Sequence, residues 1–250
     1  MGIMDKIIER AKSNKQKIVL PESFYEARTV KAGAIIQREG IADVTLLGDP
    51  AKVKDLVKDV GISLDGVAIL DHEKSDLLES FAETYREIRV KENLTKDQAI
   101  AQMKDPLYFG TMMVKKGIMG GMTCGAYNTT ANVMRAAIKI IGSQKGIKTV
   151  SSCFLMIVPD CPYGADGAMI YADCGTVPNP NEEQLADIAI AAAGMCKMLL
   201  GVEPYVAMLS FSTYVSAKDP LVDKVINATK IAKAKAPELN IDGELQGDSA

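Results

Sequence analysis

The chain has 250 residues, of which 48% are hydrophobic and 24% charged, and its formal net charge is −3. This length can bury one large core or two smaller ones, and the composition is that of an ordinary globular protein. The lysines are interspersed with acidic residues, which argues against a nucleic-acid partner. No apolar run approaches the length of a membrane span, and the N-terminal sequence MGIMDKIIERAKSNK indicates an amphipathic helix rather than a signal peptide.

Cysteine and histidine usage argues against several kinds of site. The five cysteines are odd in number and lack CxxC spacing, which indicates reduced thiols in a cytoplasmic protein rather than disulfides or a zinc site. The only histidine, His72, lies in a charged segment that we expect to be exposed. A histidine-based triad, a multi-histidine metal centre or any other metal site is therefore not expected. Because tryptophan is absent and aromatic residues make up 5%, a surface that stacks on bases is not expected either.

Apolar runs and amphipathic segments alternate along the first half of the chain. This order favours a parallel sheet covered by helices on both faces. Strands are predicted at residues 17–20, 42–47, 67–70 and 118–122. Helices are predicted at residues 3–13, 25–38, 50–59, 74–91, 96–103 and 106–116, and after residue 130.

The second half continues in the same style without repeating the sequence. Two apolar runs flank a segment rich in turn residues, 159–164, which suits a hairpin. The predicted elements are the apolar runs 149–158 and 168–172, a buried helix at 182–200 capped by Asn181, a strand at 205–209, a Ser/Thr-rich loop at 210–216, a helix at 220–236 and a strand at 239–245. We place a boundary within 143–148, which predicts α/β domains at 1–145 and 146–250.

The stretch 117–142, GIMGGMTCGAYNTTANVMRAAIKIIG, combines a short apolar strand, a turn of small residues and a helix. Asn128, Thr129 and Thr130 are favoured cap residues for that helix. Small residues let a ligand approach the backbone, and hydroxyls with free amides at a helix start attract an anion. Arg135 lies one and a half turns into the helix, where its side chain could reach back to the anion. Spacing alone also fits an ordinary capped helix with a solvated arginine.

The same stretch resembles the signature segment of the phosphate acetyl/butyryltransferase family, which commonly reads DGMVSGAxNTTANVLRPALQIIG. Further stretches resemble this family in the same order and at the same spacing, from about residue 3 to the last residue. They are KIVLPES with Arg28 and Thr29, GIADVTLLGDP, YREIRVKENLT, MKDPLYFGTMMVKKG, VPDCPYG, ADCGTVPNPNEEQLADIAI, VAMLSFST and KAPELNIDGELQ. The resemblance implies an isocitrate/isopropylmalate dehydrogenase-like fold of two αβα three-layer domains with an interdomain cleft.

The resemblance also implies the activity of a phosphate acetyltransferase. The family transfers an acetyl group reversibly between acetyl phosphate and coenzyme A, by attack of the coenzyme A thiolate on the acyl carbonyl. Such a reaction needs a base for the thiol, cations for the phosphate and donors for the developing oxyanion. We accordingly expect a cytoplasmic, homodimeric enzyme of acetate metabolism. Its partners would be small-molecule substrates (acetyl phosphate, coenzyme A and phosphate), with no permanently bound cofactor.

The family's substrate-binding positions can be carried over residue by residue. Arg135 matches the arginine that binds the phosphoryl group, for which a bidentate guanidinium is better suited than lysine. Arg89 matches a second arginine, implicated in binding coenzyme A or phosphate. Asn128, Thr129 and Thr130 match the helix start that holds phosphate oxygens.

A second loop also matches, but its sequence departs from the family pattern. Thr213 and Ser216 match a loop that usually reads STKGSA, a candidate wall of the acyl cleft. Cys161 matches a cysteine that some members carry, and we expect it to be a bystander. Departures from the usual pattern fall at Ser23, Gly120, Cys124, Met134, Ala136, Val177, Tyr214 and Val215. Most lie in loops where small size or polarity normally has a reason.

The general base is not assigned to any residue of this chain. Family members continue for roughly another eighty residues, and the resemblance places the aspartate proposed as thiol base in that part. Asp160 and Asp173 lie in the right half of the sequence, but nothing marks either as a substitute. Three alternatives stay open: a phosphate butyryltransferase, a truncated and catalytically impaired remnant, and a decarboxylating dehydrogenase of related fold.

Overall fold

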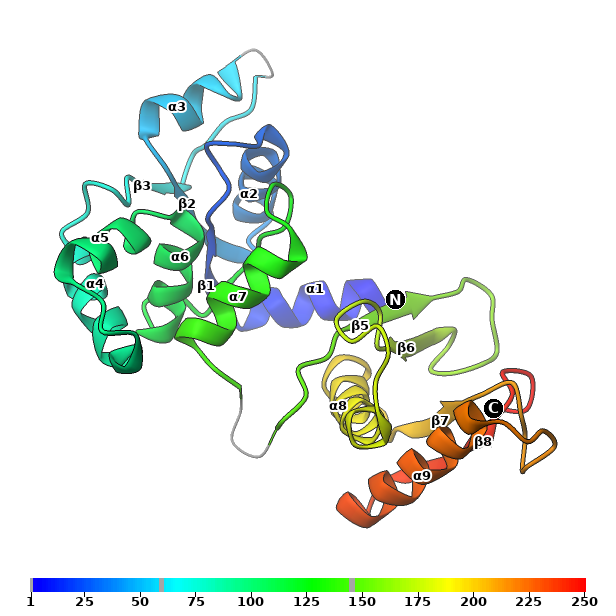
Figure 1. The fold of residues 1–250 in the computed structure, drawn as a ribbon. Coiled ribbons are helices and arrows are strands. Elements are labelled where there is room, and N and C mark those ends of the chain that lie inside the picture. The colour runs from blue at the N-terminus through cyan, green and yellow to red at the C-terminus, as the bar shows by residue number, and fades with distance from the viewer. Residues whose placement is uncertain (1, 59–60, 144–146) are drawn as a thin grey trace. The chain divides into compact units, whose positions relative to one another are not determined.

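The computed structural model describes residues 2–58, 61–143 and 147–250 (Figure 1). It divides into two compact units, Met1–Gly142 and Ser143–Ala250. The predicted domain boundary, between residues 145 and 146, lies outside the described residues.

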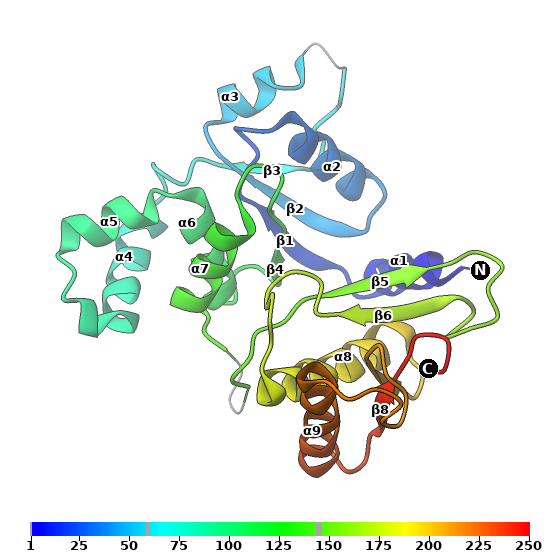
Figure 2. The same cartoon turned by 45° about the vertical axis from the view of Figure 1, so that its right-hand side comes forward.

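The first unit is built on a four-stranded sheet in the order β3-β2-β1-β4 (Figure 2). Its strands are β1 (Gln16–Leu20), β2 (Ala42–Leu47), β3 (Ala68–Leu70) and β4 (Gly121–Met122). All three neighbouring pairs are parallel, which confirms the predicted parallel sheet. Because the strands are parallel, the loops that follow them emerge at one edge, where open α/β sheets bind ligands.

Adjacent residues of the central strands point to opposite faces of the sheet. Leu20 and Leu46, which are partners in the β1–β2 register, belong to one hydrophobic core. Their chain neighbours Val19 and Leu47 belong to the other core. The strands are therefore buried on both sides, as their continuous apolar sequences predict.

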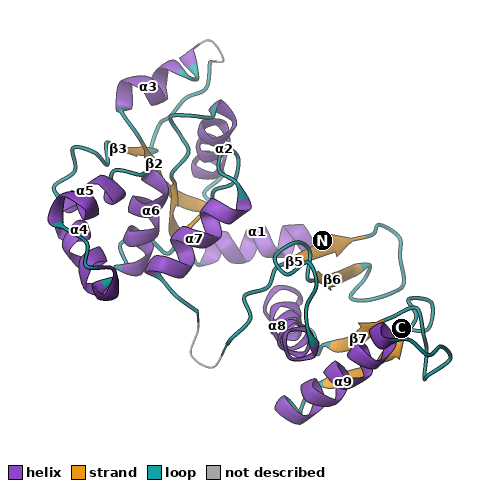
Figure 3. Cartoon of the chain, in the orientation of Figure 1, coloured by secondary structure: helices purple, strands orange, loops and turns teal. Residues whose placement is uncertain are grey.

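Helices other than α1 cover both faces of this sheet in the first unit (Figure 3). The helices of this unit are α1 (Ile3–Ser13), α2 (Ala27–Arg38), α3 (Pro50–Asp55), α4 (Leu77–Ile88), α5 (Lys96–Met103), α6 (Pro106–Lys115) and α7 (Thr130–Ile140), with a short 3₁₀ helix η2 (Val90–Glu92). Residues of α2 and α3 pack into one core, and residues of α4 to α7 pack into the other. This unit therefore has three layers.

Two predicted helices are shorter than expected. The helix predicted at 74–91 ends at Ile88 and is followed by the 3₁₀ turn η2, because Arg89 has non-helical dihedral angles (φ −105°, ψ 31°). The helix predicted at 50–59 ends at Asp55. Its predicted last residue lies outside the described part of the chain.

The expectation that His72 is exposed is wrong. Only 2% of its surface is exposed, although Glu73 and Lys74 beside it are exposed. The ring packs between Phe24 and Phe109, each with ring centroids 5.8 Å away. Its Nε2 lies 2.9 Å from the carbonyl oxygen of Lys104, so the neutral ring donates its proton there. Burial lowers the pKa of His72, against the hydrogen bond to Lys104 and the nearby carboxylates.

In the second unit, the described strands pair two by two. They are β5 (Cys153–Ile157), β6 (Ala168–Ala172), β7 (Tyr205–Leu209) and β8 (Asn240–Leu245), with the helices α8 (Glu182–Leu200) and α9 (Pro220–Lys235). The predicted hairpin is confirmed, because β5 and β6 are antiparallel. Strands β7 and β8 are parallel, and they share a core with α8 and α9. A three-layer arrangement is thus seen in the first unit only, within the described residues.

Two further features bear on the sequence-based expectations. None of the described helices combines the length and apolar composition that crossing a membrane requires. All five cysteines lie in described segments, and each is a free, half-buried thiol.

Candidate active site

Two loops meet at the carboxyl edge of the first unit's sheet. Strands β1 and β4 are parallel neighbours, with Val19 opposite Met122. The loop after β1 therefore lies beside the turn after β4, which leads into α7. The first loop carries Glu22, and the turn contains the segment 125–128.

The carboxylate of Glu22 fills this turn. One of its oxygens, Oε2, accepts hydrogen bonds from the amides of Gly125 and Ala126, at 2.9 and 2.8 Å. The other, Oε1, accepts from the amide and the side-chain nitrogen of Asn128, at 2.8 and 3.0 Å. Only 1% of the Glu22 surface is exposed. The backbone of this turn, which we expected a ligand to approach, is therefore already bonded to a carboxylate of the protein itself.

The charge state of this cluster follows from its contacts. Burial raises the pKa of Glu22, but the four hydrogen bonds from Asn128, Ala126 and Gly125 outweigh it and lower the pKa below 4.5. Burial, together with the charge of Glu22, raises the pKa of the Cys124 thiol to about 11. Glu22 is therefore ionised and Cys124 is a protonated thiol at neutral pH, so Cys124 is not an activated nucleophile.

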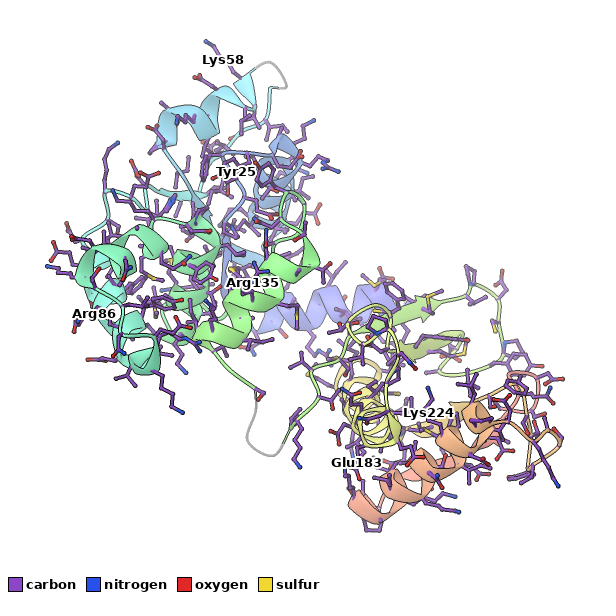
Figure 4. All side chains as sticks on the ribbon, viewed as in Figure 1. Tyr25, Lys58, Arg86, Arg135, Glu183 and Lys224 are labelled. Carbon is purple, nitrogen blue, oxygen red and sulfur yellow. The ribbon has the colours of Figure 1, made fainter. Side chains whose placement is uncertain are left out.

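An exposed aromatic pair reinforces the contact between the two loops. The rings of Tyr25 and Tyr127 stack with centroids 4.4 Å apart and an interplanar angle of 11°. Tyr25, labelled in Figure 4, follows β1, whereas Tyr127 belongs to the turn after β4. Arg28 also contacts the turn after β4. Its Nη2 donates to the carbonyl oxygen of Ala126 at 3.5 Å and to Oε2 of Glu26 at 2.8 Å.

The start of α7 carries two predicted site residues, Thr129 and Thr130, and Arg135 follows in its second turn. Thr129 caps the helix, since its hydroxyl accepts the amide of Asn132 at 3.3 Å. Thr129, Thr130 and Arg135 are all exposed. Arg135 reaches back along the helix, because its Nη1 donates to Oδ1 of Asn132 at 3.0 Å (Figure 4). No hydrogen bond within the described residues uses the amides of Thr130 and Ala131.

Arg89 lies in the same unit, at the C-terminal end of α4. It forms an ion pair with Glu92, to which its Nε donates at 3.2 Å. The same carboxylate is 3.9 Å from Nζ of Lys139, on α7. Glu92 therefore partly neutralises two cations that a phosphate could use.

Tyr108, on α6, is buried in the core of the first unit. Burial and the charge of Asp105 raise the pKa of its hydroxyl, and the charges of Arg135 and Arg89 act to lower it.

Thr213 and Ser216 belong to the second unit and stabilise their own loop. The Ser216 hydroxyl accepts the amide of Thr213 at 3.1 Å. The Thr213 hydroxyl accepts the amide of Gln246 at 2.8 Å. The first contact is a local cap, whereas the second joins the loop to the residue that follows β8. The role of both residues in substrate binding stays a prediction.

A buried carboxylate also holds this second loop. Glu244, on β8, is 2% exposed and accepts hydrogen bonds from the Ser212 hydroxyl, at 3.0 Å, and from the amide of Val215. The hydrogen bond from Val215 lowers the pKa of Glu244, against the effect of burial. The loop 210–217 is thereby attached to the neighbouring strand.

The residues that depart from STKGSA are strained. Tyr214 and Val215 have φ angles of 46° and 64°, in the left-handed region that a glycine adopts without cost. For a β-branched residue such as Val215 this conformation is an outlier. The Tyr214 hydroxyl donates to Oδ2 of Asp242 at 2.6 Å, which ties the outer end of the loop to β8.

Asp173, in the second unit, is poorly suited to accept a proton. Asp173 accepts hydrogen bonds from the amides of Gly175, Thr176 and Val177, and from the amide and hydroxyl of Ser152. Although burial raises its pKa, these contacts lower it well below the usual range. Asp160 is exposed, and Cys161 beside it is half-buried.

Sequence reasoning missed four residues of these clusters: Glu22, Glu92, Tyr108 and Glu244. Each is a single polar residue in an otherwise ordinary strand, turn or helix, so no local pattern marks it. One feature of the sequence could have indicated the burial of Glu22: it directly follows the buried strand β1 and Pro21. A carboxylate at the end of such a strand is buried only when donors surround it.

Comparison with known proteins adds the family context. A model of the family described as Phosphate acetyl/butaryl transferase matches residues 2–250. The phosphate acetyltransferases of Acetivibrio thermocellus and Thermoanaerobacterium thermosaccharolyticum are 50% and 47% identical to the whole chain, which covers 74% and 75% of their lengths. A phosphotransacetylase structure from Streptococcus pyogenes superposes with a TM-score of 0.89 at 35% identity, over 99% of this chain and 73% of that one.

We expect Val215→Gly to raise the free energy of unfolding of the second unit by about 1 kcal/mol, because relief of left-handed strain exceeds the added entropy of the unfolded chain. Chemical denaturation measures this change. Val158→Gly is the matched control, since Val158 is similarly exposed but is not among the positive-φ residues, and it should lower stability. A Val215→Gly variant no more stable than the parent contradicts the assignment of strain.

The lowered pKa of Glu244 predicts a pH dependence of stability. Its folded pKa lies below the unfolded value of about 4.5, so the unfolded chain binds more protons there. Its contribution is fully present above pH 4.5 and is lost as the pH falls through the folded pKa. Between pH 6 and 3.5, Glu244→Gln should therefore lose less stability than the parent in isothermal denaturation. Equal slopes for the two proteins would count against the assignment.

Proposed function

Since the chain belongs to the Phosphate acetyl/butaryl transferase family, we propose that it is a phosphate acetyltransferase. It transfers an acetyl group reversibly between acetyl phosphate and coenzyme A. The identity of 50% with the Acetivibrio thermocellus phosphate acetyltransferase extends over the whole chain, which supports the acetyl enzyme.

The observation that carries the assignment to particular residues is the start of α7. There Thr129, Thr130 and Arg135 present hydroxyls and a guanidinium to solvent at the positive end of a helix dipole. Arg89 and Lys139 add positive charge in the same unit, beside Glu92. Such a donor set binds the phosphoryl group of acetyl phosphate, and a second anionic group such as a phosphate of coenzyme A.

The proposed reaction is a direct displacement at the acetyl carbonyl. A base removes the proton of the coenzyme A thiol, and the thiolate sulfur forms a bond to the carbonyl carbon. The carbon–oxygen bond to the phosphoryl group then breaks, and phosphate leaves with the bonding electron pair. Arg135 and the threonine hydroxyls hold the phosphoryl oxygens throughout, so the phosphate leaves with its charge compensated.

Neither Asp173 nor His72 is suited to be the base. Asp173 is saturated with hydrogen bonds, and the buried ring of His72 donates to a backbone carbonyl. We propose no residue of this chain as the base. The impaired-remnant alternative predicts binding of acetyl phosphate without turnover, which an assay of acetyl-CoA formation distinguishes.

The remaining alternatives differ in the substrate that each enzyme would use. A phosphate butyryltransferase would prefer butyryl phosphate, which a parallel assay with both acyl phosphates decides. The family membership leaves no support for the decarboxylating dehydrogenase. We further propose that coenzyme A is a substrate rather than a resident cofactor, and that the enzyme is a cytoplasmic homodimer with the isocitrate/isopropylmalate dehydrogenase-like fold.

Arg135→Ala should lower kcat/KM for acetyl phosphate by at least about 100-fold, because it removes a charged donor from the leaving phosphate. Arg135→Lys should recover part of this loss, since lysine keeps the charge but not the bidentate geometry. The measurement is coenzyme A-dependent formation of acetyl-CoA. Arg38→Ala is the control, because Arg38 is exposed near the C-terminal end of α2 and should not affect turnover. An active Arg135→Ala variant excludes the proposed role.

Glu92→Gln should lower the KM for coenzyme A by up to about fivefold, because Arg89 would no longer be paired with a carboxylate. The change should shrink at high salt, which screens the same interaction. Glu83→Gln is a matched control, since Glu83 pairs with Arg86 at the same i,i+3 spacing on α4. Equal effects of the two variants would argue against Arg89 as an anion-binding residue.

A further inference from the structure

We propose that Glu22 is a positioning residue for the substrate phosphate: it occupies the turn 125–128 and directs the phosphate to the first turn of α7. This inference rests on the proposed function, since it concerns the same anion site. It assigns a role to a residue that does not itself touch the substrate.

The turn is closed to a second anion. Each oxygen of Glu22 already accepts two N–H groups, at distances between 2.8 and 3.0 Å. A phosphate that sought the amides of Gly125, Ala126 or Asn128 would have to displace a buried carboxylate. It would also have to approach the negative charge of Glu22, which repels a second anion. The turn 125–128 is thus an anion site that the carboxylate of Glu22 already occupies.

The donors that remain lie one step further along the chain. Within the described residues, the amides of Thr130 and Ala131 make no hydrogen bond, and they are the first amides of a helix of 11 residues. The exposed hydroxyls of Thr129 and Thr130 lie at the same end. Arg135, held by Asn132 at 3.0 Å, extends its guanidinium back toward them. This set is open to solvent and carries no carboxylate.

Glu22 also fixes the position of the start of α7, and thus of these hydrogen-bond donors, relative to the sheet. It is two residues beyond the end of β1, and it bonds to the residue that directly precedes the cap Thr129. The Tyr25–Tyr127 stack and the Arg28 contact with Ala126 lie at the same junction. Loss of the carboxylate would release the turn and let the start of α7 shift, and small displacements of a binding group weaken binding substantially.

Steady-state kinetics on the full chain tests the positioning role. In Glu22→Gln a single amide oxygen remains as acceptor, and the NH₂ group faces donors that it cannot satisfy. We expect the KM for acetyl phosphate to rise about tenfold or more, while the KM for coenzyme A changes less than twofold. Glu22→Asp, which keeps the charge on a shorter side chain, should recover part of the loss. Val30→Ala is a destabilising control, because Val30 is a residue of α2 that is buried in the core. It should lower Tm without raising the KM for acetyl phosphate more than the KM for coenzyme A.

A titration with inorganic phosphate, followed by amide NMR of the full chain, locates the anion directly. We expect the largest shifts at Thr130 and Ala131, and small shifts at Gly125 and Ala126. Shifts centred on Gly125 and Ala126, or no shifts at α7, would overturn the inference, as would equal KM changes for both substrates in Glu22→Gln. Failure of the proposed function is distinguishable from failure of this inference. The first appears as absence of acetyl-CoA formation by the parent chain. The NMR shifts test the second, and they are measured without any turnover.

Discussion

A buried carboxylate that collects backbone N–H groups is the interaction on which the loops of this protein depend. Glu22 does this for the turn before α7, and Glu244 does it for the loop 210–217. Asp173, which is half-buried, gathers the segment 175–177 in the same way. In each case the cost of removing a charge from water is offset by several charge-assisted hydrogen bonds. The result is an irregular segment with a defined conformation that needs little apolar packing.

The parallel sheet makes this interaction possible in the first unit. Neighbouring parallel strands end at the same edge, so the loop after β1 and the turn after β4 meet although they are far apart in sequence. The helices on both faces bury the strands, so polar groups gather at the edges of the sheet, of which this is one. The exposed start of α7 is therefore a consequence of sheet topology combined with one well-placed carboxylate.

Local patterns in the sequence predict most of the secondary structure, because caps and apolar periodicity act over a few residues. Asn181 caps its helix as the sequence predicts, and Asp49 and Thr95 cap the helices that begin at Pro50 and Lys96. Burial of His72 was not predictable, since it depends on Phe24 and Phe109 from distant segments. The bond between Glu22 and the turn was missed for the same reason. Arg135 and Thr129 were found through their family motif, but a motif does not reveal which amides are already occupied.

The carboxylates bind mainly the backbone of these loops, and this has a consequence for how the loops evolve. Val177 and Val215, two departures from the family pattern, each contribute their amide to such a carboxylate. An amide N–H is common to every residue except proline, so the contact persists when the side chain changes, although the backbone conformation at Val215 still favours glycine. A substitution of Glu22, Asp173 or Glu244 removes the contact, whereas most substitutions of a residue that donates only its amide keep it. Homologues are accordingly better compared at these three acids than by the identity of the residues that they hold.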